Sequence, residues 1–157
     1  MNTAANQAAF LRDALSQALG PSTLINTADT ALYTTDVYSP GAAPGLVVKP
    51  TTPAQVADAV RISTQAGWAI TQRGGGMSYT GGYLPQRAET VMLDLSALNR
   101  IVSIDEDDLV ITVEAGVTWQ QIWEALTPRG LRLPFFGTFS GSRATVGGGL
   151  SNGALFM

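Results

Sequence analysis

Hydrophobic residues near the start of the chain recur every three or four positions, which is typical of an amphipathic helix. The repeat runs over residues 8–19, and Gly20-Pro21 follows it directly. Glycine and proline end a helix, so we predict that the first element stops there. Residues 33–45 contain prolines and glycines without a regular apolar repeat, and we predict an irregular segment.

A short apolar run, Leu46-Val47-Val48-Lys49, predicts a buried strand. Thr52 then suits the N-cap of a helix, and Gln55 suits the return bond of a capping box. Gly67 supplies the left-handed turn that ends this helix, and residues 68–71 begin a second strand. A strand-helix-strand crossover joins parallel strands and is almost always right-handed.

The second half of the chain contains further strand patterns. Residues 91–95 predict one strand, and residues 101–104 and 109–113 predict a hairpin around a charged turn. Thr118 and Gln121 have the spacing of a capping box, so a helix is expected to begin there.

The strongest candidate for chemistry is a glycine loop that follows the second predicted strand. Five glycines fall within the ten residues from Arg73 to Gly82. Glycine lets the backbone approach a ligand closely and adopt positive φ, so successive N–H groups can converge on an anion. The hydroxyls of Ser78 and Thr80 and the guanidinium of Arg73 add candidate donors. The pattern therefore predicts a loop that binds a diphosphate.

Other phosphate loops fit this segment less well. A P-loop requires Lys and then Ser or Thr after its second glycine, whereas Gly82 and Tyr83 follow Gly81. A dinucleotide fingerprint requires a glycine three residues after Gly76, and Tyr79 occupies that position. A flexible glycine linker between two strands remains the alternative.

A second cluster of glycines and small polar residues spans residues 138–153. Two anion-binding loops in one small domain suggest a long ligand. Gly147-Gly148-Gly149 is expected to begin a helix whose N-terminus faces a phosphate or an electron-rich ring edge. The alternative is a surface loop that frays near the end of the chain.

Composition excludes several classes of function. Charged residues make up only 13% of the 157 residues and hydrophobic residues 45%, which indicates either a covered surface or an uncharged polar one. The net charge is -3 without a basic stripe, which argues against nucleic acid. The chain has no cysteine and no histidine, so no disulfide and no metal site is expected. Without a secretory signal or a long apolar run, we expect a cytoplasmic protein with no membrane span.

Taken in order, these segments resemble the FAD-binding domain of the vanillyl-alcohol oxidase and p-cresol methylhydroxylase family of flavoproteins. The glycine loop is most similar to the branch that contains glycolate and D-lactate dehydrogenases. The matching segments are Val47-Val48-Lys49-Pro50-Thr51, the loop from Arg73 to Gly82, Met92-Leu93-Asp94-Leu95, Leu98-Asn99-Arg100-Ile101, Val113-Glu114-Ala115-Gly116-Val117 and Thr145-Val146-Gly147-Gly148.

The resemblance implies an α+β fold of the PCMH type, with two α+β subdomains and FAD extended between them. Residues 1–45 would form an N-terminal helix and a lead-in, and residues 46–157 the FAD-binding domain. Members of the family continue with further strands and a cap domain that contacts the substrate. The chain is therefore expected to be an N-terminal fragment that meets its small-molecule substrate through a cap domain it lacks.

The resemblance also implies where FAD binds. Pro50 would lie near the adenine, the glycine loop would hold the diphosphate, and the second cluster would line the diphosphate and the isoalloxazine. Met77 occupies the position where the family often has a histidine that attaches the flavin, so we expect noncovalent FAD; a link through Tyr79 or Tyr83 is the remaining covalent route. The implied residues are Pro50, Arg73, Gly74, Gly75, Gly76, Met77, Ser78, Tyr79, Thr80, Gly81, Gly82, Thr138, Ser140, Ser142, Thr145, Val146, Gly147, Gly148, Ser151 and Asn152.

The implied activity is the oxidation of an alcohol or 2-hydroxy acid by hydride transfer to flavin N5, with the fragment alone inactive. No catalytic residue is assigned, because Asp94 and Glu114 are interpreted as strand-end and turn residues. Two alternatives stay open. One is a noncatalytic module that binds a nucleotide or phosphate. The other is a flavoprotein similar to enolpyruvyl-sugar reductases, whose loop usually has Asn at the position of Tyr79.

Overall fold

A computed structural model describes residues 3–134 and 141–153. The chain divides into two compact units. The first contains the residues up to Arg73 together with Tyr79–Leu95, and the second contains Gly74–Ser78 and the residues from Ser96 onward. The lead-in thus belongs to the same unit as the first strands, and the glycine loop is divided between the two units.

The first unit is built on a three-stranded parallel sheet. β1 (Leu46–Val48) and β2 (Ala69–Arg73) both pair with β3 (Thr90–Asp94), which lies between them. The predicted strand-helix-strand unit is present, but its two strands are not neighbours, because β3 separates them. All the residues of β3 are buried, as expected for a central strand of a parallel sheet.

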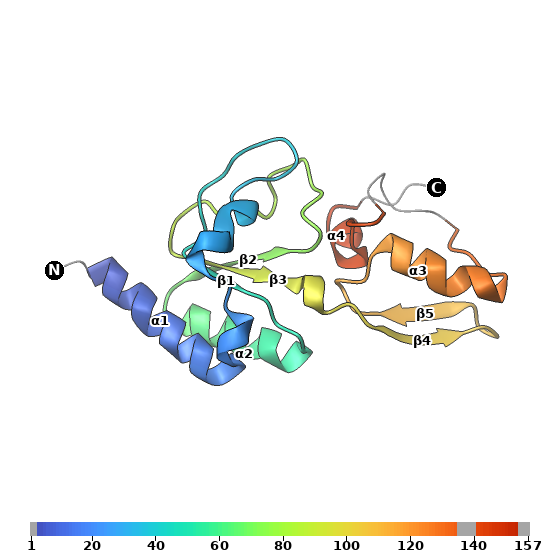
Figure 1. Cartoon of the computed structure of the whole chain (residues 1–157), viewed down its shortest axis with the longest axis horizontal. Coiled ribbons are helices and arrows are strands. Elements are labelled where there is room, and N and C mark those ends of the chain that lie inside the picture. Colours follow the sequence, from blue (N-terminus) through green and yellow to red (C-terminus); the bar gives the residue numbers. More distant parts are fainter. Residues whose placement is uncertain (1–2, 135–140, 154–157) are drawn as a thin grey trace. The chain divides into compact units, whose positions relative to one another are not determined.

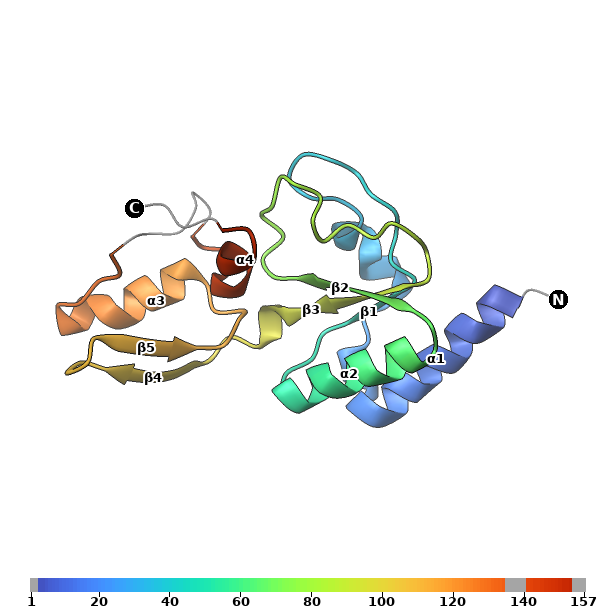
Figure 2. The ribbon, with the colours of Figure 1, turned by 180° about the vertical axis from the view of Figure 1, so that it is seen from behind.

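Two helices lie side by side against one face of this sheet (Figure 1, and from behind in Figure 2). They are α1 (Thr3–Leu19) and α2 (Pro53–Gln65). Alternation along the strands sends Leu46 and Leu93 toward the helices, where they join a core with Leu15 of α1. Leu15 is fully buried, so the first helix is part of the core.

The opposite face of the sheet is covered by chain outside the main helices and strands. Val47 of β1 and Met92 of β3 belong to a core there with Tyr33, Tyr83 and Leu84. Tyr33 ends a 3-10 turn before β1, and the other two residues follow the glycine loop. The segment predicted to be irregular therefore packs on the sheet together with the end of the loop.

The second unit contains a hairpin and two helices. β4 (Ile101–Asp105) and β5 (Val110–Val113) pair in antiparallel fashion, as predicted. The inward residues of both strands pack with α3 (Trp119–Leu126) (Figure 1). The last helix is α4 (Val146–Ser151), which lies within the second glycine cluster.

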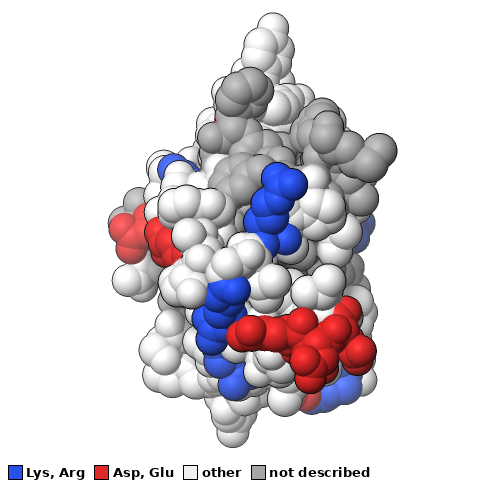
Figure 3. Space-filling model, turned by 90° about the vertical axis from the view of Figure 1, so that its right-hand side faces the viewer, with Lys and Arg blue, Asp and Glu red and all other residues white. Residues whose placement is uncertain are grey.

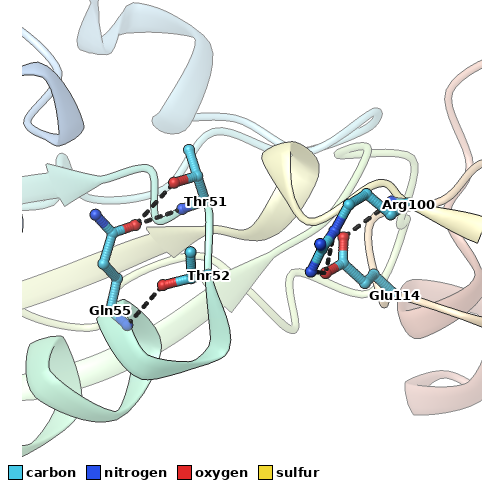
Figure 4. Close-up of polar contacts among 5 residues, drawn as sticks. All are labelled: Thr51, Thr52, Gln55, Arg100 and Glu114. Atoms are coloured by element: carbon cyan, nitrogen blue, oxygen red, sulfur yellow. Dashed lines mark hydrogen bonds and ion pairs between the residues drawn. The ribbon is translucent and has the colours of Figure 1, made fainter. Parts of the chain in front are cut away.

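Side-chain caps fix the starts of α2 and α3. Thr118 and Gln121 form the predicted capping box of α3. At α2, Thr52 Oγ1 accepts the predicted hydrogen bond from the N–H of Gln55 at 3.2 Å. The side chain of Gln55 reaches one residue further back than a capping box requires, because its Oε1 accepts from the N–H of Thr51 at 2.8 Å (Figure 4).

An ion pair closes the open end of the hairpin. Arg100 precedes β4 and Glu114 follows β5, and Arg100 Nη2 lies 2.7 Å from Glu114 Oε1 (Figure 4). Glu114 Oε2 also accepts from the backbone N–H of Arg100 at 2.9 Å. These hydrogen bonds hold the pKa of Glu114 below its ordinary value. The carboxylate thus has a structural partner, in agreement with its interpretation as a strand-end residue.

We expect Glu114→Gln to lower the melting temperature at neutral pH, with a smaller effect in acid. The depressed pKa means that the charged form stabilises the fold above the ordinary value of 4.5, and that this stabilisation is lost as the pH falls through the folded-state value. Circular-dichroism melts between about pH 7 and about pH 3 measure the difference.

Glu106→Gln is the matched control, because the side chains of Glu106 and its partner Arg129 are 57% and 43% exposed and their pair contributes little. An equal destabilisation by Glu114→Gln at both ends of the pH range would contradict the prediction.

Met92 is fully buried in the central strand, so Met92→Ala leaves a cavity and should lower the free energy of unfolding by about 2–5 kcal/mol. Urea unfolding followed by circular dichroism measures this change. Leu32 is 68% exposed in the same unit, and Leu32→Ala should change the free energy by no more than about 0.5 kcal/mol. Comparable losses in both variants would show that Met92 is not a core residue.

Candidate cofactor site

The carboxyl ends of three parallel strands meet at one edge of the sheet in the first unit. Open sheets of parallel strands bind ligands outside this edge. Pro50 lies just beyond β1, while Arg73 and Asp94 end β2 and β3 and are partners in register. The glycine loop begins at the residue after Arg73, so it starts at the edge where a ligand is expected.

Arg73 is packed inside the first unit. It is only 9% exposed, and its Cζ lies 5.1 Å from the ring centre of Tyr33 and 5.6 Å from that of Tyr83. A cation over aromatic rings is stabilised by the negative faces of the rings. The guanidinium of Arg73 therefore interacts with aromatic rings inside the protein. Its predicted contact with a cofactor stays a prediction.

Asp94 belongs to the same buried cluster. Its Oδ2 accepts a hydrogen bond of 2.7 Å from the hydroxyl of Tyr33. Burial raises the pKa of Tyr33 far above its ordinary value, and the hydrogen bond to Asp94 raises it further. Tyr33 therefore keeps its proton at neutral pH and acts as a donor, and Asp94 is engaged as its acceptor.

The second half of the glycine loop lies in the first unit. Tyr79 and Thr80 are exposed, and Gly81 adopts a φ of 66°, which favours glycine. The N–H of Gly81 donates to Asp36 Oδ2 at 2.8 Å. Sequence reasoning missed both Asp36 and Tyr33, because they lie in the segment interpreted as irregular.

The first half of the loop lies in the second unit and packs against the second glycine cluster. A Cβ on Gly75 would overlap the carbonyl group of Arg143, and a Cβ on Gly74 would overlap the hydroxyl of Thr145. The two clusters thus approach at a distance that only glycine permits. Neither a flexible linker nor a frayed surface loop would require this packing, so it favours the predicted built loops over both alternatives.

The second cluster begins a helix, as predicted. Thr145 is the N-cap of α4, and its side chain accepts from the N–H of Gly148. The N–H of Val146 donates to Val117 O at 2.8 Å, and that of Gly147 donates to Ala115 O at 2.9 Å. These bonds tie α4 to the segment before α3. A phosphate at the start of α4 would have to compete with them.

Polar side chains of the second cluster reach the surface. Arg143 is exposed and forms no ion pair with any described residue. Its backbone carbonyl group contacts Gly75, so Arg143 belongs to the segment against which the glycine loop packs. Its side chain adds a positive charge to that segment. Arg143 was not among the predicted site residues. The exposed residues that were predicted are Ser142, Ser151 and Asn152.

Met77 is partly buried against the core of the second unit, which includes Val117 and Trp119. The position thus holds an apolar side chain that packs within the protein. With no histidine or cysteine in the chain, the residue types that usually attach a flavin covalently are absent.

The predicted residues of the first unit are Pro50, Arg73, Tyr79, Thr80, Gly81 and Gly82, and those of the second are Gly74, Gly75, Gly76, Met77, Ser78, Ser142, Thr145, Val146, Gly147, Gly148, Ser151 and Asn152. Thr138 and Ser140 lie outside the described residues. The described residues contain no group of three or more acidic, histidine or cysteine side chains able to hold a metal ion. Nor does that part of the chain contain a helix long and apolar enough to cross a membrane.

Charge is unevenly distributed on the surface. On the face that Figure 3 draws, acidic side chains form a large patch and a separate smaller group, while Lys and Arg side chains lie in several places. The end of β4 and the turn after it carry four consecutive acidic residues, from Asp105 to Asp108. This face has no continuous basic stripe of the kind that binds nucleic acid.

Comparison with known proteins gives a consistent match. Residues 44–156 match the model of a family described as FAD binding domain. The chain is 33% identical over 122 residues to D-lactate dehydrogenase [cytochrome] 1, mitochondrial, of Saccharomyces cerevisiae, covering 76% of this chain and 20% of that protein. It is 32% identical over 151 residues to D-2-hydroxyglutarate dehydrogenase of Escherichia coli, covering 92% of this chain and 14% of that protein. The chain thus spans a fifth or less of the length of these relatives.

Among solved structures, the chain resembles p-cresol methylhydroxylase with substrate bound. The TM-score is 0.74 at 24% identity, and the match covers 88% of this chain and 28% of that one. At this identity the likeness concerns the fold alone.

We expect Gly75→Ala to lower the free energy of unfolding by about 1–3 kcal/mol, because the new methyl group forces the backbone away from Arg143. Gly82→Ala is the control, since its Cβ would lie 3.3 Å from the hydroxyl of Thr80, a side chain that can rotate away. Urea unfolding of both variants tests the difference. Equal stability of Gly75→Ala and the unchanged protein would mean that the two clusters do not pack as described.

Proposed function

The chain belongs to the family of FAD-binding domains, and from that premise we propose that it binds FAD noncovalently as part of a flavin-dependent oxidoreductase acting on an alcohol or 2-hydroxy acid by hydride transfer to flavin N5. The α+β fold and the resemblance to the p-cresol methylhydroxylase family, both predicted from the sequence, are confirmed. The chain spans only part of its relatives, so the activity, the substrate and the substrate contacts through a cap domain belong to the proposal, as does the cytoplasmic location.

The single observation that carries the proposal is the packing of the two glycine clusters in the second unit. Gly74 and Gly75 lie against Arg143 and Thr145, and Gly76 adopts a φ of 70° directly after them. A glycine backbone with positive φ, next to a segment that carries the exposed Arg143, suits an anion with several oxygens. The residues present therefore fit the diphosphate of FAD.

In the proposed complex, the backbone of residues 74–78 and the hydroxyl of Ser78 would hold the diphosphate. Hydrogen bonds to charged oxygens contribute about 1.5–3 kcal/mol each, so a few of them orient the cofactor firmly. The side chain of Arg143 would neutralise part of the phosphate charge. The flavin supplies the redox chemistry when bound.

No catalytic base is assigned within this chain. Asp94 accepts a hydrogen bond from Tyr33, and Glu114 is paired with Arg100. Both carboxylates are therefore engaged in structural contacts. The chain's proposed contribution is to bind and orient the cofactor.

Two observations support the finer parts of the proposal. The names of two relatives describe dehydrogenases of D-lactate and of D-2-hydroxyglutarate, which are both 2-hydroxy acids. Met77 occupies the position where the resemblance implies a histidine that attaches the flavin, and the chain contains no histidine or cysteine elsewhere. Noncovalent FAD and a 2-hydroxy acid substrate are the simplest combination.

The experiment is to mix the purified chain with FAD, remove excess cofactor and record the visible spectrum. We expect the absorption of oxidised flavin, and we expect acid precipitation to leave all the flavin in the supernatant. Flavin that precipitates with the protein would contradict noncovalent binding and direct attention to Tyr79 or Tyr83. A protein that stays colourless but binds ADP would instead support a noncatalytic nucleotide-binding module.

Arg143→Gln should weaken FAD binding by about 10- to 100-fold, the range expected for the loss of a hydrogen bond to a charged group. Arg132 is also exposed in the second unit but lies outside the glycine clusters, so Arg132→Gln should leave the affinity unchanged. Quenching of flavin fluorescence on titration measures both dissociation constants. Equal weakening by the two substitutions would show that Arg143 acts through net charge alone.

A further inference from the structure

The carboxylate of Asp36 connects two segments of the first unit that are far apart in sequence. Its Oδ1 accepts from the N–H groups of Tyr38 at 2.8 Å and of Ser39 at 2.5 Å, which closes a tight turn. Its Oδ2 accepts from the N–H of Gly81 at 2.8 Å. Each oxygen therefore has a separate task, one within its own turn and one on the glycine loop.

Other contacts fasten the same two segments together. The hydroxyl of Tyr83 donates to Thr35 O at 3.0 Å. Gly41 lies so close to Leu84 that a Cβ added to it would be 2.8 Å from Cβ of that residue. The segment before β1 thus contacts residues 81–84 by a charged hydrogen bond, a neutral hydrogen bond and close apolar packing.

Asp36 is charged when it makes these contacts. The N–H groups of Ser39 and Tyr38 lower its pKa most, and that of Gly81 lowers it further. Asp36 is only 8% exposed, so little water competes for its oxygens. Hydrogen bonds to an ionised acceptor are about twice as strong as neutral ones, which makes this contact stronger than the neutral hydrogen bond from Tyr83 to Thr35.

We propose that Asp36 is a positioning residue for the cofactor site: it holds the second half of the glycine loop in place by accepting the N–H of Gly81. This inference rests on the proposed function, because the loop it positions is the one proposed to bind FAD. It also assigns Gly81 to the support of the loop, although the sequence predicted it to bind the diphosphate.

The test compares Asp36→Asn with Asp29→Asn in the FAD-free protein. An asparagine has one acceptor oxygen, so it serves either the turn or Gly81 but not both. Asp29 is exposed in the same lead-in segment, so its substitution removes the same charge without that hydrogen bond. We expect the Gly81 amide to exchange with solvent about tenfold faster in Asp36→Asn and at the original rate in Asp29→Asn, by NMR of labelled protein.

The second measurement is FAD affinity by fluorescence titration. Asp36→Asn should weaken binding about tenfold and Asp29→Asn should not. Leu15→Ala, on the other face of the sheet, is the control for lost stability: it should lower the melting temperature while leaving FAD affinity and Gly81 exchange in the folded protein unchanged.

The inference is overturned if Gly81 exchanges at the same rate in Asp36→Asn and the unchanged protein, or if Leu15→Ala or Asp29→Asn loosens Gly81 equally. Failure of the unchanged protein to bind FAD would refute the proposed function, whereas the exchange measurement would still decide whether Asp36 holds the loop. Faster exchange with unaltered FAD affinity would show that Asp36 fixes the loop without positioning the cofactor site.

Discussion

The close approach of Gly75 to the carbonyl group of Arg143 is the constraint on which the second unit depends. No side chain larger than hydrogen fits between these two backbones. A few residues further along the second cluster, the N–H groups of Val146 and Gly147 donate to the carbonyl groups of Val117 and Ala115. The segment before α3 and both glycine clusters are therefore joined by backbone contacts, beside the apolar core that α3 shares with the hairpin.

The first unit is held together mainly by two apolar cores, one on each face of its sheet. Strict alternation along buried strands sends one set of side chains to α1 and α2 and the other set to the lead-in and the end of the glycine loop. At the carboxyl edge of the sheet the core becomes polar, and Arg73 lies between two tyrosine rings near Asp94. Buried charges are tolerated only with partners, so this cluster fixes the point where the glycine loop leaves the sheet.

Local features were predictable from the sequence, and long-range ones were not. The end of α1 at Gly20, the hairpin and the capping box at Thr118 follow from neighbouring residues, and each is present. The place of β3 between its partners depends on pairing across the chain, which periodicity does not encode. Asp36 shows the same limit, because an aspartate before Ser39 indicates a turn, but nothing local reveals that its other oxygen reaches Gly81.

The glycine clusters illustrate why residue type alone gives an incomplete account of a site. The pattern was interpreted as a set of amides free to bind an anion, yet Gly81, Val146 and Gly147 donate to acceptors within the protein. Gly81 lies in a turn with positive φ, and Gly147 packs closely against Ala115. Both situations favour glycine because it has no side chain. These three amides are therefore engaged within the protein, which the residue types alone do not reveal. A loop whose backbone is already packed loses less conformational entropy on binding a diphosphate than a mobile loop does, so it orients the ligand better.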